Sequence, residues 1–147
     1  MTTRKVSFGE LLISVPPKWQ FETRSEESVS WPEGRDAAVT VSSYARIAPK
    51  APTKGEVHEQ SSRFARQLGW PAPTAIEFEC DERGGVSAFF GATISDGVSD
   101  ALRTWGVRVL LSTRRLIIAS YNVAESDRSE CEHDLVAIIR SVREADN

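Results

Sequence analysis

Residues 86–123 read VSAFFGATISDGVSDALRTWGVRVLLSTRRLIIASYNV and contain three runs in which apolar side chains recur at every second position. Successive side chains of a β-strand point to opposite faces, so this period of two predicts three strands. Turn-forming residues at 95–97 and 112–115 separate the runs. The stretch therefore predicts an antiparallel meander, with Trp105 and Ile117 among the side chains that face the core.

The rest of the chain adds strands to this meander. Residues 76–80 alternate in the same way and lead into the first run through a turn at 81–85. Alternating apolar runs are also present before the meander, and we expect short strands at 6–8, 11–15, 28–31 and 37–44.

Two amphipathic helices complete the predicted elements. Thr53 and Glu56 have the spacing of a capping box, in which both side chains satisfy backbone N–H groups at the start of a helix. Apolar residues at helical spacing then predict a helix over 54–68. A second apolar stripe, with cap candidates at 126–129, predicts a closing helix over 131–142.

These elements predict an α+β fold: an antiparallel β-sheet of about six to seven strands with two main helices packed on it. The chain has 147 residues, of which 40% are apolar and 27% are charged. That length and composition are typical of one soluble domain with an ordinary core. We therefore expect a single globular domain spanning residues 1–147.

Charge and hydropathy exclude several classes of protein. A net charge of -3 gives no electrostatic reason to bind a polyanion broadly, so we expect no nucleic acid partner. The longest aliphatic runs are strand-sized, which predicts no membrane span. Arg4 and Lys5 are followed by an interrupted apolar stretch that does not fit a signal peptide, so we expect a cytoplasmic protein. Cys80 and Cys131 both fall on predicted apolar faces, where buried free thiols are expected.

The chemistry-bearing residues do not form a catalytic or metal-binding pattern. His58 and His133 lie on the polar sides of the two predicted helices and are not paired at i, i+4. The sequence contains neither a phosphate-binding glycine loop nor a nucleophile elbow. We therefore expect no catalytic residue, no metal and no cofactor, and we do not expect an enzyme.

Six side chains are candidates for a binding surface: Trp70, Phe89, Leu102, Arg103, Trp105 and Leu110. The alternation places Phe89, Leu102 and Leu110 on the sheet face opposite the predicted core. That face is therefore semi-apolar, and either the chain itself or a partner covers it.

The other three candidates have two interpretations each. Arg103 shares a face with Trp105, where it either extends from the strand end to solvent or places a charge at the mouth of an apolar groove. Trp70 lies in a loop that Pro71 and Pro73 stiffen. It either caps the core or serves as an exposed anchor for an interface.

The order of elements resembles that of the PsbP-like fold, which is shared with DcrB-type bacterial proteins. Two local patterns strengthen the resemblance: an aliphatic strand that runs into proline and tryptophan at 15–19, VPPKW, and a closing helix with the pattern IIRSV at 138–142. The resemblance implies a small accessory or binding module without a shared catalytic site. Related bacterial domains include adaptor chaperones for secretion effectors.

The leading hypothesis is a non-catalytic cytoplasmic module that acts through protein–protein contact, as an adaptor chaperone or an immunity-type protein. Its partner would be another protein or a second copy of the chain. One alternative is a carrier of a small apolar or anionic ligand, with Trp105 and Arg103 lining the pocket. Another alternative is an unrecognised enzyme.

Overall fold

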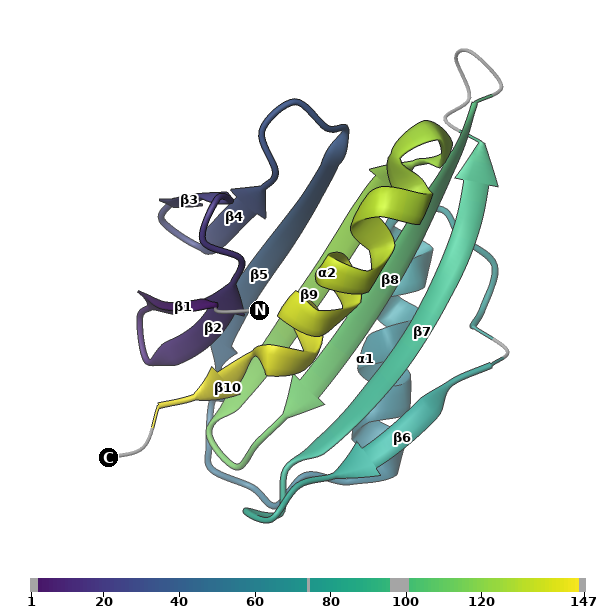
Figure 1. Ribbon diagram of the computed structural model, residues 1–147. Helices are drawn as coiled ribbons and strands as arrows, with labels where there is room; N and C mark the ends of the chain where they lie inside the picture. Colours follow the sequence, from purple (N-terminus) through teal and green to yellow (C-terminus); the bar gives the residue numbers. More distant parts are fainter. Residues whose placement is uncertain (1–2, 74, 96–100, 146–147) are drawn as a thin grey trace.

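The computed structural model describes residues 3–73, 75–95 and 101–145, and Figure 1 shows a twisted antiparallel sheet with one helix on each face. The turn predicted at 95–97 falls largely outside these residues. The main sheet has seven strands in the spatial order β3 (Gln20–Thr23), β4 (Glu27–Trp31), β5 (Ala37–Ala45), β9 (Arg115–Ala124), β8 (Leu102–Leu111), β7 (Val86–Ser95) and β6 (Glu77–Cys80).

A second, smaller sheet lies beside the main one. It consists of β1 (Arg4–Phe8), β2 (Leu11–Val15) and the two-residue strand β10 (Arg143–Glu144). β1 and β2 form the predicted opening hairpin, with Gly9 at φ 58° in the turn. β10 pairs with the other edge of β2, so the two ends of the chain meet in one sheet (Figure 1).

Helix α1 (Lys54–Gln67) begins and ends as the sequence predicts. The Thr53 Oγ1 accepts a hydrogen bond from the Glu56 N–H at 3.2 Å, which satisfies one of the free donors at the helix start. Gly69, at φ 75°, follows the last turn. The helix packs against β7 and β8 and leaves the half of that sheet face over β4 and β5 uncovered.

Helix α2 (Arg128–Ser141) follows a short 3-10 turn (Glu125–Asp127) and packs on the opposite face of the sheet. Asp127 stands at its N-terminal cap position, but its side chain makes no capping bond there. The carboxylate instead accepts from the Asp36 N–H at 2.9 Å and from Arg35 at 3.3 Å. Asp127 therefore ties the helix start to the segment before β5.

The main sheet has a hydrophobic core on each face, which corrects the single inward face predicted for the meander. In the β8–β9 register, Val109 pairs with Ile118 and Leu110 pairs with Ile117. Directly paired residues share a face, so Ile117 lies with Leu110 under α2 while Trp105 faces the α1 side. Each strand alternates as the sequence predicts, but β8 and β9 have the opposite phase relative to each other from the one predicted.

The two cysteines differ in environment. Cys131 is buried in the α2-side core, and that burial raises the pKa of its thiol. Cys80 is exposed, contrary to the expectation of a buried thiol. The physical reason is that β6 is the edge strand of the main sheet and Cys80 is its last residue, so the sheet continues on one side of it only.

The predicted fold class is confirmed: two helices pack on antiparallel sheet, in an α+β arrangement. Within the described residues, neither helix has the length and apolar character that a membrane-spanning helix needs.

Candidate functional site

An open pocket of about 500 Å³ lies where the C-terminal end of α2 and β10 meet the turns at one end of the main sheet. Three carboxylates line it, those of Asp81, Glu82 and Glu144. It is called the arginine pocket below, because five arginines from separate parts of the chain also line it: Arg83, Arg108, Arg114, Arg140 and Arg143. The lining thus has a formal charge of +2, whereas the whole chain has -3.

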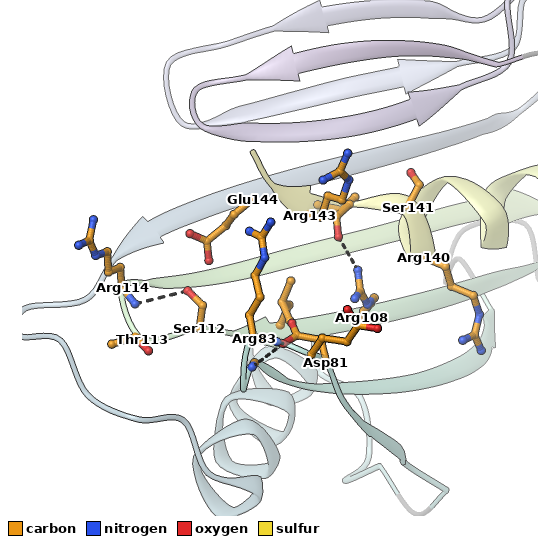
Figure 2. A pocket seen from close by; sticks show the side chains of 14 residues that line it. Asp81, Arg83, Arg108, Ser112, Thr113, Arg114, Arg140, Ser141, Arg143 and Glu144 are labelled. Carbon is orange, nitrogen blue, oxygen red and sulfur yellow. Dashed lines mark hydrogen bonds between the residues drawn. The ribbon is translucent and has the colours of Figure 1, made fainter. Parts of the chain in front are cut away.

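Arg108 forms the floor of the arginine pocket. It stands in the middle of β8, and its Nη1 donates to the carbonyl oxygens of Ile139 at 3.2 Å and Val142 at 2.8 Å (Figure 2). The Ile139 carbonyl belongs to the last turn of α2 and the Val142 carbonyl to the C-cap residue that follows it. Carbonyls at the end of a helix lack partners within the helix. Arg108 therefore caps the helix and ties it to the sheet.

The guanidinium group of Arg108 is half-buried. Desolvation lowers the pKa of its guanidinium, and the nearby Glu79 carboxylate opposes that shift. Within the part of the chain that the structure describes, no carboxylate lies within ion-pair distance of Arg108. A half-buried cation of this kind has a positive potential that an incoming anion can neutralise.

Arg140 is neutralised by residues of its own chain. It lies on the exposed side of α2, with Nη1 3.2 Å from the Glu79 carboxylate and Nη2 3.7 Å from that of Glu77. Its guanidinium also lies over the Phe89 ring, 4.8 Å from the centroid. Arg140 thus joins α2 to β6 and β7 at the border of the pocket.

Arg114 stands at the opposite end of the arginine pocket from Arg140 (Figure 2). It is exposed in the β8–β9 turn, where its backbone N–H donates to the Ser112 Oγ at 3.4 Å. Among the described residues, none forms an ion pair with its guanidinium. Arg114 and Arg108 therefore both have charge available to a ligand.

Asp81 has a structural role in the β6–β7 turn. Its Oδ1 accepts from the backbone N–H groups of Arg83 at 2.8 Å and Gly85 at 2.7 Å. A carboxylate held by two backbone donors closes the turn in the manner of an Asx-turn. This turn also places Arg83 at the edge of the arginine pocket (Figure 2).

Comparison with solved structures identifies the architecture. The solution structure of cyanobacterial PsbP (CyanoP) from Synechocystis sp. PCC 6803 matches with a TM-score of 0.73 and 14% identity, over 97% of this chain and 92% of that one. The chain has the PsbP-like fold. A crystal structure from Bacteroides thetaiotaomicron VPI-5482 matches with a TM-score of 0.65 and 10% identity, over 100% of this chain and 50% of that one. No protein-family model and no curated protein sequence matches the chain.

These likenesses show the fold alone. The resemblance to the PsbP-like fold predicted from the sequence is therefore confirmed. Its extension to DcrB-type proteins stays a prediction, since neither structure bears on it.

In the PsbP-like sheet of this chain, the three apolar residues predicted to share a face are covered to different degrees. Leu110 is 6% exposed beneath α2 and also lines the arginine pocket, whereas Leu102 is 49% exposed at the start of β8. Phe89 is half-buried under Arg140. The chain's own helix thus covers most of this face, which corrects the placement of Leu110 away from the main core.

The two tryptophans lie together on the α1 side. The Trp70 ring meets the Trp105 ring edge to face at 5.3 Å and the Phe64 ring at 5.9 Å. Both tryptophans are half-buried, so Trp70 caps the α1-side core.

Arg103 is held by Asn122 and Asp36. Its Nε donates to the Asn122 Oδ1 at 2.7 Å, and its Nη1 donates to the Asp36 carboxylate at 3.1 Å. The shallow hollow that Arg103 lines is bordered by residues of β3, β4 and β5 and not by Trp105.

None of the five lining arginines is among the binding residues that the sequence predicts. One signal was present: Arg108 interrupts WGVRVLL, an otherwise apolar run at 105–111. A charged side chain in the middle of a central strand needs a partner or a function. Nothing in the sequence indicates that Arg83, Arg114 and Arg143 come to the same place.

The two histidines lie apart from each other and from the arginine pocket. His58 is exposed on α1 and His133 is exposed on α2, on opposite faces of the sheet. Across residues 3–73, 75–95 and 101–145, no group of three His, Cys, Asp or Glu side chains is placed to hold a metal ion.

Proposed function

We propose that this chain is a non-catalytic binding module and that the arginine pocket is its binding site, with an anionic ligand. The proposal rests on the placement of Arg108 and Arg114. Both guanidinium groups line one open pocket, and neither forms an ion pair within the described chain. Arginine's planar fork suits carboxylate and phosphate groups, which it binds with charge-assisted hydrogen bonds.

The surroundings support binding over catalysis. The pocket's lining carries five arginines, three carboxylates and several hydroxyl groups, and the two histidines lie elsewhere. Its volume of about 500 Å³ lies in the range of sites for small molecules or short segments of a partner. A role as an adaptor chaperone or an immunity-type protein, and a cytoplasmic location, remain predictions from the sequence.

The first test uses Arg114→Ala, with pyrophosphate as a generic anionic probe and isothermal titration calorimetry as the measurement. Removing one charge-assisted hydrogen bond should weaken binding about tenfold. Arg66→Ala is the matched control, because Arg66 is exposed on α1 on the other face of the sheet. Added salt should weaken binding to the unmodified protein.

Two results would contradict the proposed function. One is an absence of binding at low salt. The other is an equal effect of Arg114→Ala and Arg66→Ala, which would show that the probe responds only to the overall charge of the protein.

A further inference from the structure

β10 is an edge strand whose outer side is available for pairing. It is the last strand of the small sheet, and among the described residues it pairs with β2 alone. Glu144 stands opposite Leu11, and the next residue, Ala145, donates its N–H to the Glu10 carbonyl at 2.7 Å. In an antiparallel ladder, every second residue directs its N–H and C=O toward the partner strand. Because Ala145 is directed toward β2, Glu144 directs its N–H and C=O away from β2.

The outer side of β10 faces the arginine pocket. The Val142 carbonyl accepts from Arg108 at the pocket floor, and Val142 has extended backbone angles of φ -62° and ψ 126°. In extended backbone, carbonyls two residues apart point to the same side. The Glu144 carbonyl therefore points to the pocket side, and Glu144 itself lines the pocket.

The available charges lie on either side of this backbone group. Figure 2 shows Glu144 between Arg114 and Arg108. The pocket, at about 500 Å³, is much larger than one small anion, since a water molecule occupies about 30 Å³ of liquid. A ligand with two separate anionic groups can pair with both arginines at once.

We propose that the arginine pocket binds an acidic, extended segment of a partner protein. The segment adds to the outer edge of β10 through the N–H and C=O of Glu144, and its carboxylates pair with Arg108 and Arg114. Main-chain pairing at a sheet edge supplies affinity in this binding mode, and the charged side chains supply selectivity. This inference rests on the proposed function and adds the class of partner.

The experiment compares Glu144→Pro with Glu144→Ala. Proline removes the N–H that points into the pocket, while the donor to β2 at this end of the strand, Ala145, is unchanged. Alanine removes the same carboxylate and keeps the N–H, so it is the matched control. The probes are an acetylated hexaglutamate peptide and pyrophosphate, each titrated into the full chain by calorimetry.

We expect the hexaglutamate peptide to bind to Glu144→Pro about tenfold more weakly than to Glu144→Ala. Pyrophosphate should bind equally to the two variants, since it makes no main-chain pairing. A second measurement does not depend on how the proline variant folds: in nuclear magnetic resonance spectra of the unmodified protein, the peptide should slow exchange of the Glu144 amide proton.

Distinct results overturn the two proposals. If pyrophosphate binds with dependence on Arg114 but the peptide does not bind, the proposed function holds and the acidic segment is wrong. Equal peptide binding to the proline and alanine variants, with no protection of the Glu144 amide, overturns strand addition. If neither probe binds, the proposed function fails as well.

Discussion

At the scale of single residues, Arg108 combines two roles that oppose each other energetically. Burial of its charge costs desolvation energy, which lowers the pKa of the guanidinium. Its hydrogen bonds to the Ile139 and Val142 carbonyls offset that cost by satisfying the end of α2. The same side chain thus holds the helix on the sheet and supplies positive charge to the arginine pocket.

Arg108→Met should lower the free energy of unfolding by about 1–2 kcal/mol, because two carbonyls lose a charged donor while the apolar stem is kept. Urea denaturation followed by circular dichroism measures the change. The control Arg66→Met should stay within about 0.5 kcal/mol of the unmodified protein. If Arg108→Met were as stable as that control, the capping role would be wrong.

A second residue-scale prediction concerns Asp36. Its hydrogen bonds with Arg103 lower the pKa of the carboxyl, and burial partly opposes the shift. A depressed pKa stabilises the folded state above the pKa of the unfolded chain, about 3.9, and that contribution is lost as the pH falls through the folded-state value. Asp36→Asn should therefore be less stable than the unmodified protein at pH 7, with a smaller difference below pH 3. Urea denaturation at both pH values measures it, and a constant difference would contradict it.

At the scale of elements, α2 connects the arginine pocket to the core. Its buried face, including Leu135, Ile138 and Ile139, packs on the sheet, and its C-terminal end supplies the carbonyls that Arg108 caps. Ser141 at its end also accepts from the Ser14 N–H in β2 at 3.0 Å. The helix therefore fixes the position of β10, which follows it directly.

Ile138→Asp should unfold the domain, because it places a carboxylate at a position that is 2% exposed, with a cost above about 4 kcal/mol. Its neighbour Ala137 is exposed on the same helix, so Ala137→Asp is the matched control. Loss of the cooperative thermal transition for Ile138→Asp alone is the expected result. A folded Ile138→Asp protein would show that α2 is not needed for the core.

At the scale of the whole molecule, the main sheet of the PsbP-like fold has a hydrophobic core on each face. Charged residues gather at one end of that sheet. The strands of the main sheet supply side chains to both cores, so neither helix can be removed without exposing apolar surface. The arginine pocket lies where α2, β10, the β6–β7 turn and the β8–β9 turn converge (Figure 2). It therefore exists only when both sheets and α2 are in place.

Much of the fold follows from local patterns along the chain. The capping box at Thr53 and Glu56 and the alternation of residues 86–94 and 105–111 depend on neighbours in the sequence, and the structure confirms these elements. Asp127 shows the limit of such patterns. It has a residue type and position suited to capping α2, but the segment before β5 takes its carboxylate instead.

The sequence by itself determined the type and limits of most elements, because helix and strand periods and caps are local properties. Tertiary structure alone decided which face each strand presents to which helix. Alternation separates the two faces of a strand, but the pairing of Leu110 with Ile117 sets the phase between strands. Tertiary structure also decided where the site lies. Arg83, Arg108 and Arg143 are far apart in the sequence, and only long-range packing brings their charges around one pocket.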